Sequence, residues 1–361
     1  MTIRYPRSPE EVGLMADVAA AAFGPNALSE PWRERYAAVE QVFGRSVFLG
    51  LEVDGRFVSS CTCIPAQVWV RDRRLTLGAV GGVATLPECR RQGYAGALMR
   101  AVVAHMQEQG LALSALWPFS FPYYRKFGWD YASERRHYRF AVERLGALPD
   151  PGGVSPAVPE DLPDIAAAYE QHARSLAFST DRYERWWREL LRNQGVAGFA
   201  PAHRVSQRMM VCRDGGQVQG YAVYAFSGGE ERRVEVRELV ALTADTRLRL
   251  VAALAADGAA EVSVRLPAND TWRFQVADPR AVTVTAEPGF SFRVVDPAAA
   301  LDVLAAPAEL RGTLRLRLHD PARPEAILSV AAEVAGGEVW VHRSASQAGG
   351  LWMETDIPTF S

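Results

Sequence analysis

The sequence predicts an α+β (α/β) chain in which one order of helices and strands occurs twice, followed by a smaller α+β segment. Asp-Gly at residues 54–55 and Asp-Gly-Gly at residues 214–216 each join two strands of alternating apolar residues, and each hairpin leads to a further strand and a helix. Residues 312–318 then alternate apolar and charged side chains, as a half-solvated strand does. These patterns predict three domains, at residues 1–147, 148–283 and 284–361.

Length and composition narrow the class of protein. The 361 residues suffice for two or three domains, and the 48% hydrophobic content can build their cores. A net charge of −2 argues against a general nucleic-acid binder. The sequence has no apolar run of about 18 residues, and charged residues interrupt its start, where a signal peptide would need an apolar core. We therefore expect a cytoplasmic protein without a nucleic-acid or membrane partner.

The cysteines do not predict a metal site. Cys61 and Cys63 share one face of a predicted strand, and Cys89 and Cys212 stand alone. Because no second pair follows at the spacing of a zinc site, we interpret them as buried thiols in a reducing compartment. We expect no bound metal.

The first domain is predicted to open with a strand at residues 2–5 and a helix that Ser8 and Glu11 begin as a capping box. A second helix is expected over residues 31–43. Four strands follow, at residues 46–53, 56–63, 68–70 and 75–86, with a turn at 71–73. A strand at residues 137–142 is expected to end the domain.

A turn rich in glycine and arginine follows the strand at residues 75–86. Pro87 ends the apolar run because proline cannot donate to a sheet, and Gly93 lets a ligand approach the backbone. Apolar residues then recur at helical spacing over residues 95–106. The N–H groups at the start of a helix favour a phosphate, and Arg90 and Arg91 add positive charge. The turn suits a pyrophosphate; the alternative is an ordinary turn with two solvated arginines.

Two motifs carry a resemblance to a known family. Residues 90–95, Arg-Arg-Gln-Gly-Tyr-Ala, lie between a strand and a helix and resemble the pyrophosphate loop of the GNAT superfamily of acyl-CoA N-acyltransferases. Residues 124–129, Tyr-Arg-Lys-Phe-Gly-Trp, resemble the Tyr-x-x-Phe-Gly-Tyr stretch of the enhanced intracellular survival (Eis) branch. The resemblance implies tandem GNAT domains and acetyl-CoA as the co-substrate.

The resemblance also assigns residues to the cofactor site. Those implied along the pantetheine are Val83, Ala84 and Thr85. Those implied at the pyrophosphate are Arg91, Gln92, Gly93, Tyr94, Ala95 and Gly96. Phe119 and Ser120 are implied next to the cofactor. Thr85 replaces an aliphatic residue of the branch and Trp129 replaces a tyrosine, but neither change removes a donor that the mechanism needs.

Tyr124 is the catalytic residue that the resemblance implies. In the Eis branch this tyrosine is the general acid that protonates the departing CoA thiolate. A phenol suits that role because it keeps its proton at neutral pH. The alternative is a core aromatic beside Phe127 and Trp129, with its hydroxyl in a hydrogen bond.

The middle third repeats the order of the first domain after a linker at residues 149–153. Helices are predicted over residues 159–173, 180–192 and 246–256, and strands over 209–212, 218–226 and 234–241. The turn at residues 242–247 has no glycine and places Asp245 where a phosphate would bind. Because like charges repel, we interpret this domain as a degenerate GNAT copy that does not bind CoA. The alternative is an unrelated α/β domain.

The last third, residues 284–361, resembles the sterol-carrier-protein-like domain that ends Eis-type chains. A helix to about residue 305 and strands at residues 312–318, 326–334 and 338–341 are predicted. In that branch the domain is structural and shapes the active site. The alternative is any other small α+β domain. The family also implies a homohexamer.

The resemblance implies an N-acetyltransferase that acts by direct transfer on primary amines of bulky, polyamine-like substrates of the aminoglycoside type. Two alternatives stay open. One is another tandem GNAT acyl or aminoacyl transferase, similar to mycothiol synthase. The other is a non-catalytic sensor that binds acyl-CoA or lipid. A tyrosine placed for proton transfer favours an enzyme.

The chain end bears on the general base. In Eis-type enzymes the terminal α-carboxylate takes the proton from the attacking amine, and here that group belongs to Ser361. Residues 353–361 resemble instead a strand-to-helix passage that lies well before the terminus of those chains. We therefore expect a truncated form that lacks this base, with cofactor binding retained and weak turnover.

Overall fold

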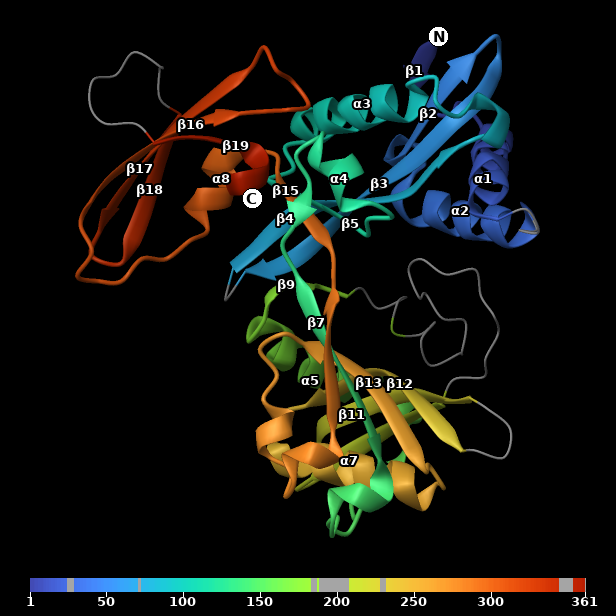
Figure 1. Cartoon of the computed structure of the whole chain (residues 1–361), viewed down its shortest axis with the longest axis vertical. Coiled ribbons are helices and arrows are strands. Elements are labelled where there is room, and N and C mark those ends of the chain that lie inside the picture. The colour runs from blue at the N-terminus through green and yellow to red at the C-terminus, as the bar shows by residue number, and fades with distance from the viewer. Residues whose placement is uncertain are drawn as a thin grey trace. The chain divides into compact units, whose positions relative to one another are not determined.

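The computed structural model describes residues 1–24, 29–70, 73–182, 187, 208–227, 232–343 and 353–360. The chain forms two compact units. The first unit joins Met1–Ala132 with Phe290–Ser361, and the second unit is Ser133–Gly289. The first unit therefore combines the blue and cyan elements of Figure 1 with orange and red ones from the other end of the chain.

A mixed sheet forms the centre of the first unit. Its strands, in spatial order, are β1 (Thr2–Arg4), β2 (Phe48–Val53), β3 (Arg56–Val70), β4 (Arg73–Thr85), β5 (Leu113–Leu116), β15 (Ser291–Val294) and β6 (Asp130–Tyr131). The pair β4–β5 is parallel, and the other neighbours are antiparallel. The predicted hairpin at residues 54–55 is confirmed, whereas the two strands predicted over 56–70 form one continuous strand, β3.

Helices cover both faces of this sheet. They are α1 (Pro9–Phe23), α2 (Ser29–Phe43) and α3 (Tyr94–Glu108). Neighbouring residues of a strand point to opposite faces, and Phe48 accordingly joins the core under α1 and α2 while Leu49 joins the core under α3. Ser8 caps α1 by accepting a hydrogen bond from the Glu11 N–H. The sheet thus holds α3, and the turn before it, on one face.

The second unit has its own sheet and helices. Its strands, in spatial order, are β14 (Thr283–Pro288), β7 (Glu134–Ala141), β13 (Glu261–Pro267), β12 (Arg233–Ala241), β11 (Gln217–Ser227), β10 (Arg208–Asp214) and β8 (Val154–Pro156). Its helices include α5 (Leu162–Arg174) and α7 (Ala244–Ala256). The helix predicted over residues 180–192 lies largely outside the described residues, and residue 180 itself ends strand β9 (Ala177–Thr180).

Two strands lie in sheets that the sequence did not predict. The strand expected at residues 137–142, at the end of the first domain, is β7 in the sheet of the second unit. Conversely, β15, whose residues lie in the predicted third domain, pairs with β5 in the first unit. Apolar alternation predicts a strand but not its partner, which is set by distant residues. Here Tyr138 and Phe140 of β7 pack against Trp272 of the second unit.

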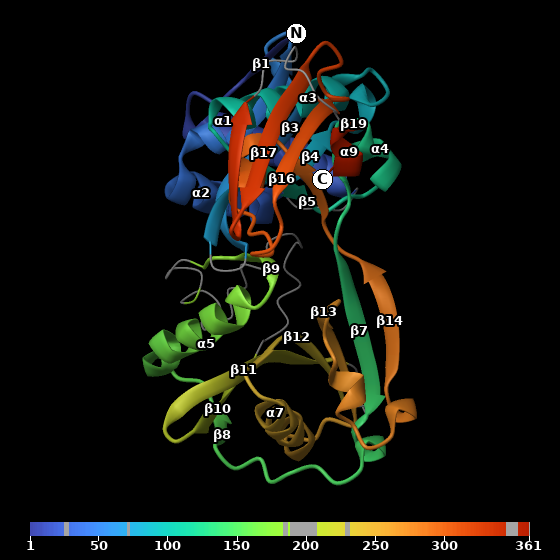
Figure 2. The same ribbon diagram turned by 90° about the vertical axis from the view of Figure 1, so that its left-hand side faces the viewer.

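The C-terminal segment, residues 297–360, adds a small mixed sheet to the first unit. Its strands, in spatial order, are β18 (Glu338–Arg343), β17 (Ile327–Ala335), β16 (Gly312–His319) and β19 (Met353–Asp356), and its helices are α8 (Pro297–Asp302) and α9 (Ile357–Phe360). Figure 2 shows β16 and β17 side by side. Leu318 and Ile357 are fully buried in its core. The strands predicted at residues 312–318, 326–334 and 338–341 are confirmed to within a few residues.

Candidate active site

The parallel strands β4 and β5 part at one end. Their pairing runs from Leu77 with Leu113 to Val80 with Leu116, where β5 ends, whereas β4 continues to Thr85. Past Val80, the backbone of β4 is paired with β3 along one edge, and its other edge has no strand partner among the described residues. Val83, Ala84 and Thr85, the residues predicted along the pantetheine, lie on this segment. An extended amide ligand can pair with a strand edge of this kind.

A β-bulge shapes this segment of β4. The register of β3 and β4 shifts between Ser60 and Thr62, so that Gly82 and Val83 lie opposite one residue of β3. Gly82 has a left-handed backbone with φ +58°, and a Cβ there would lie 2.5 Å from the Tyr36 hydroxyl. Only glycine therefore fits without backbone strain and without a shift of the Tyr36 side chain on α2.

Side-chain hydrogen bonds hold the end of β4 in place. The Ser59 hydroxyl donates to the Ala84 carbonyl at 2.6 Å and lies 2.9 Å from the Thr85 hydroxyl. Ala84 is buried, whereas Val83 and Thr85 are partly exposed. Thr85, the residue that departs from the family pattern, is thus bound to β3 by its own hydroxyl.

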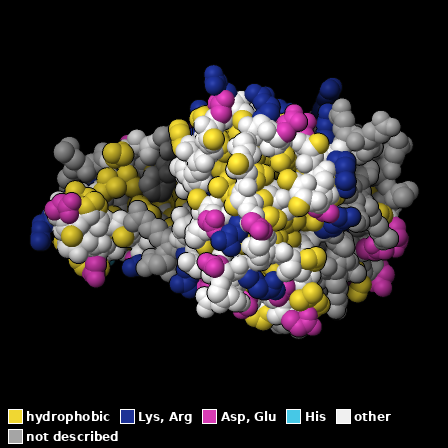
Figure 3. Space-filling model, turned by 90° about the horizontal axis from the view of Figure 1, so that it is seen from below, with side chains coloured by type: hydrophobic (Ala, Val, Ile, Leu, Met, Phe, Trp, Pro, Cys, Tyr) yellow, Lys and Arg dark blue, Asp and Glu magenta, His cyan; other side chains and the backbone are white. Residues whose placement is uncertain are grey.

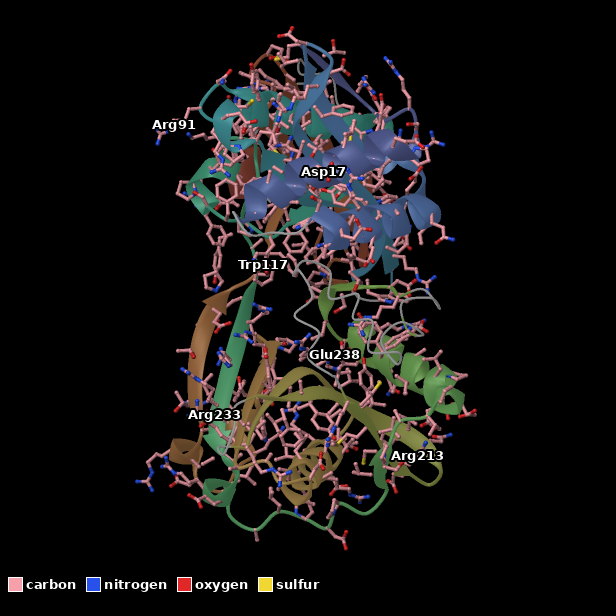
Figure 4. All side chains as sticks on the ribbon, turned by 90° about the vertical axis from the view of Figure 1, so that its right-hand side faces the viewer. Asp17, Arg91, Trp117, Arg213, Arg233 and Glu238 are labelled. Carbon is pink, nitrogen blue, oxygen red and sulfur yellow. The ribbon has the colours of Figure 1, made fainter. Side chains whose placement is uncertain are left out.

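The turn predicted to hold a pyrophosphate connects β4 to α3. Gly93 precedes the helix with φ +82°, and Arg91 also has a left-handed backbone, φ +63°. Because Gly93 has no side chain to cap α3, the N–H groups of Tyr94, Ala95 and Gly96 start the helix without a side-chain cap. The side chain of Arg90 donates to the Ala22 carbonyl at 3.2 Å. Arg91 is exposed and points away from the ribbon in Figure 4.

Tyr124 lies in a short helix after β5, α4 (Phe121–Arg125), which Ser120 caps through the Tyr123 N–H. The Tyr124 side chain is only 3% exposed. Burial raises the pKa of its phenol well above the usual value for tyrosine, so the hydroxyl keeps its proton at neutral pH. Phe119, by contrast, is 72% exposed, and its ring lies 5.2 Å from the Tyr124 ring in a T-shaped arrangement.

The structure brings three predicted parts of the site together. Tyr124 and Phe127 share a hydrophobic cluster with α3, and Val83 packs against the same cluster. At the start of α3, a Cβ at Gly96 would lie 3.5 Å from the Phe127 ring. The end of β4, the first turn of α3 and the helix α4 that carries Tyr124 therefore meet around one core.

The sequence did not predict several residues that hold the end of β4 and the Tyr124 region in place. Tyr36 and Ser59, which constrain the bulged end of β4, were not predicted. The signal for the bulge was present, since two adjacent glycines, Gly81 and Gly82, interrupt a strand. Trp129 was noted only as a departure, yet its indole N–H donates to Ser114 at 3.1 Å, and Ser114 donates to the Gly78 carbonyl at 2.8 Å.

Comparison with known families now identifies the chain. Residues 3–132 match a model described as an acetyltransferase (GNAT) domain, and residues 179–294 match a second model with the same description. The protein is a GNAT-type acetyltransferase with two GNAT domains in tandem. GNAT acetyltransferases use acetyl-CoA, which agrees with the predicted co-substrate. No curated protein sequence matched the chain.

Solved structures share the fold of this GNAT chain. A probable N-acyltransferase from Enterococcus faecalis V583 has a TM-score of 0.82 and 22% identity, over 100% of this chain and 89% of that one. A GCN5-related N-acetyltransferase from Anabaena variabilis has a TM-score of 0.81 and 18% identity, over 99% and 89%. Eis1 from Mycobacterium abscessus has a TM-score of 0.75 and 22% identity, over 100% and 88%.

The second GNAT domain differs from the first at the turn before its helix. Thr243 caps α7, and its hydroxyl accepts a hydrogen bond from the Thr246 N–H at 3.1 Å. Asp245 follows the cap with its side chain largely exposed, and its carboxylate pairs with Arg249 at 2.7 Å. A donor of this helix start is thus already bound to a side chain, and a negative charge stands in its first turn.

A small cavity lies near the ends of the parallel strands β12 and β13 in the second unit. Its volume is about 190 Å³, and Leu239, Leu266, Arg247 and Asp270 are among its lining residues. Arg247 and Asp270 form an ion pair at 3.0 Å, with little of either side chain exposed. Pockets for small ligands usually measure about 300–1,000 Å³, so the cavity is small for a cofactor such as CoA.

Charge and hydropathy complete the description of the GNAT chain. Acidic and basic side chains are interspersed over the face that Figure 3 shows. Within the described part of the chain, no helix has the length and apolar character needed to cross a membrane. In that same part, no group of three or more His, Cys, Asp or Glu side chains is arranged to hold a metal ion.

Proposed function

We propose that this acetyltransferase transfers the acetyl group of acetyl-CoA directly to primary amines of bulky, polyamine-like molecules of the aminoglycoside type. The observation that supports the transfer is the buried Tyr124 phenol, whose pKa is raised by burial and which lies in the cluster against which Val83 of β4 packs. The proposed substrate class rests on the Eis-like motif at residues 124–129 and on a fold shared with Eis1 from M. abscessus.

The first domain would bind acetyl-CoA through its backbone. The edge of β4 at Val83 to Thr85 would pair with the pantetheine amides, and the start of α3 at Gly93 to Gly96 would hold the pyrophosphate. Arg91 would add a full positive charge. Phe119 and Ser120 would border the cofactor, since Phe119 is exposed beside Tyr124.

Tyr124 would act as the general acid. Acetyl-CoA supplies an activated acetyl group, whose C–S bond breaks as the amine forms its new C–N bond. The Tyr124 hydroxyl would donate its proton to the departing sulfur, and the amine would lose one proton to a base. By resemblance to Eis-type enzymes, that base would be a chain-terminal α-carboxylate, and Ser361, which lies outside the described residues, is not among the proposed catalytic residues.

A panel of amines tests the substrate class. Mass spectrometry of the full chain incubated with acetyl-CoA and aminoglycosides, polyamines, amino acids or peptides should show acetyl groups on the first two classes, at more than one amine. Loose regiospecificity is expected by resemblance to Eis-type enzymes, whose wide pockets admit bulky substrates in several orientations. If only a small metabolite or a protein N-terminus is acetylated, the substrate proposal is wrong while the fold assignment stands. The resemblance to Eis-type enzymes also leads us to propose a homohexamer, which light scattering would test.

We expect one acetyl-CoA to bind per chain. Among the described residues, helix α3 of the first domain starts without a side-chain cap, whereas Thr243 caps the corresponding helix of the second domain and Asp245 adds a negative charge to its first turn. Isothermal titration calorimetry should give a stoichiometry near one. A stoichiometry of two would mean that the second domain is not degenerate.

A further inference from the structure

A buried ion pair joins the C-terminal segment to the sheet of the first domain. Arg293 lies on β15, and Asp320 follows β16; both side chains have an exposed fraction of 0%. The Arg293 guanidinium donates to the Asp320 carboxylate at 2.6 Å. Asp320 also accepts hydrogen bonds from the Ala322 N–H and from the Arg323 guanidinium, each at 3.0 Å.

The other end of Arg293 reaches the turn at residues 126–129, here called the Tyr124 turn because it directly follows α4 and its N–H groups bind the Tyr124 carbonyl. Its Nη1 donates to the carbonyl of Phe127. Two N–H groups of the same turn, those of Phe127 and Trp129, donate to the Tyr124 carbonyl at 2.9 and 3.3 Å. A guanidinium held by Asp320 therefore binds the turn whose backbone positions Tyr124.

Gly128 shows how closely Arg293 fits under this turn. Its backbone is left-handed, with φ +93°, and a Cβ there would collide with the Arg293 guanidinium and lie 3.3 Å from Ile357 of α9. The glycine of the Tyr-x-x-Phe-Gly motif thus leaves room for an arginine that comes from another part of the chain. Arg293 also lies over the Trp129 ring, 5.5 Å from its centre.

The C-terminal segment has a second contact with the cofactor-binding part of the site. The Arg323 guanidinium, which shares Asp320, donates to the side-chain carbonyl of Gln107 on α3 at 2.6 Å. Asp320 therefore connects, through two arginines, both the Tyr124 turn and the helix whose first turn is the proposed pyrophosphate site.

Stability alone is a weak reason for such a pair. Burying two charges costs desolvation free energy that their attraction often only offsets, so apolar replacements are frequently as stable. Burial is the largest single effect on the pKa of Asp320 and raises it, but the charge of Arg293 and the hydrogen bonds from Arg293, Arg323 and the Ala322 N–H together hold that pKa below the usual value. The pair is charged at neutral pH, and its directed hydrogen bonds specify geometry.

We propose that Arg293 and Asp320 are positioning residues for the general acid: through the Phe127 carbonyl, they hold the turn that aims the Tyr124 hydroxyl. The inference rests on the proposed role of Tyr124. It gives the C-terminal segment a part in the chemical step, since Asp320 acts from outside the GNAT domain on its catalytic turn.

The test is a double-mutant cycle between Asp320→Asn and Tyr124→Phe in the full chain. Asn keeps the shape of Asp but removes the charge that holds Arg293. We expect kcat to fall about tenfold or more, because small misplacements of a catalytic group cost rates of this order, while acetyl-CoA affinity stays within about twofold. In the Tyr124→Phe background, Asp320→Asn should change kcat by less than about twofold.

The outcomes separate the inference from the proposed function. If Asp320→Asn lowers kcat by the same factor in both backgrounds, the pair is only structural and the inference is wrong. If Tyr124→Phe has the wild-type rate, the role of Tyr124 fails, and the inference fails with it. If Asp320→Asn leaves kcat unchanged in the wild-type background, Asp320 does not position the turn.

Two further variants complete the test: one replaces Asp320→Asn if that variant does not fold, and the other is a control. Should Asp320→Asn not fold, the double variant Arg293→Met/Asp320→Leu removes both charges together and still deletes the donor to Phe127, so the same fall in kcat is expected. Full kcat in that variant would overturn the proposal. Arg343→Gln is the matched control, because it breaks an exposed pair with Asp296 in the same segment and should leave kcat unchanged.

Discussion

Replacing Tyr124 with phenylalanine is expected to lower kcat by about a hundredfold or more and to leave acetyl-CoA affinity unchanged. The phenylalanine ring would fill the same buried space between Phe119 and the cluster on α3, so only the hydroxyl is lost. A proton donor acts on the transition state, where negative charge collects on sulfur, more than on the bound ground state. Steady-state kinetics and calorimetry measure the two quantities separately.

Tyr123→Phe is the matched control for this experiment. Tyr123 is the preceding residue, its ring packs against the Tyr124 ring at 5.2 Å, and its hydroxyl is buried with no hydrogen-bond partner among the described residues. Removing that hydroxyl is the same chemical change one position away, and kcat should stay within about threefold of wild type. If wild type and both variants have equal kcat, Tyr124 is not the general acid and only packs in the core.

The pH profile gives an independent check on the same residue. Burial raises the pKa of Tyr124 above about 10, the usual pKa of a phenol. At any pH below about 10, we therefore expect no loss of kcat from deprotonation of Tyr124. The sign follows from the role: an acid is active while protonated, so activity is lost only as the pH rises through its pKa. A basic limb below pH 9 that persists in Tyr124→Phe would belong to another group.

Gly93→Asp is expected to abolish acetyl-CoA binding at concentrations that saturate the wild type. A Cβ at Gly93 meets no atom within 4 Å, so the side chain itself has space. The backbone, at φ +82°, is left-handed, a conformation that aspartate and asparagine tolerate better than other residues. The added carboxylate would face the pyrophosphate at the start of α3, and such like-charge contacts cost several kcal/mol, or more than about a hundredfold in Kd.

Gly93→Asn separates charge from backbone strain. Asparagine has nearly the shape of aspartate and the same tolerance of a left-handed backbone, but it has no charge. We expect Gly93→Asn to bind acetyl-CoA within about tenfold of wild type, as calorimetry would show. If the Asp and Asn variants bind equally well, the pyrophosphate does not lie at this turn.

The parts of the site that could be predicted are those coded by adjacent residues. Proline at residue 87 and glycine at residue 93 end a strand and start a helix through local backbone preferences, and the structure has α3 starting at Tyr94. The Asp-Gly hairpin at residues 54–55 is local in the same sense. The repeated order of these local signals predicted two similar domains, and the resemblance of residues 90–95 to the GNAT pyrophosphate loop predicted their family.

The parts that could not be predicted depend on residues far apart in the chain. In the sequence, nothing distinguishes Arg293 from other charged residues. No neighbouring residue indicates that Arg293 binds Asp320 and the Phe127 carbonyl. Likewise, Tyr36 constrains Gly82 across two layers of the fold. Strand pairing belongs to this class too, because the alternation of β7 fits either sheet equally well.

The exchange of β7 and β15 between the two sheets has a consequence for synthesis on the ribosome. Strand β5 receives its outer neighbour, β15, only after residues 133–289 have been translated. At about 5–20 residues per second, the nascent chain would expose the bare edge of β5 for on the order of ten seconds or longer. An unpaired edge is a template for wrong pairing, so we expect the emerging protein to depend on chaperones during this interval. The first unit, which contains the proposed acetyl-CoA site, therefore begins to be synthesised first but completes its sheet only after the second unit has been translated.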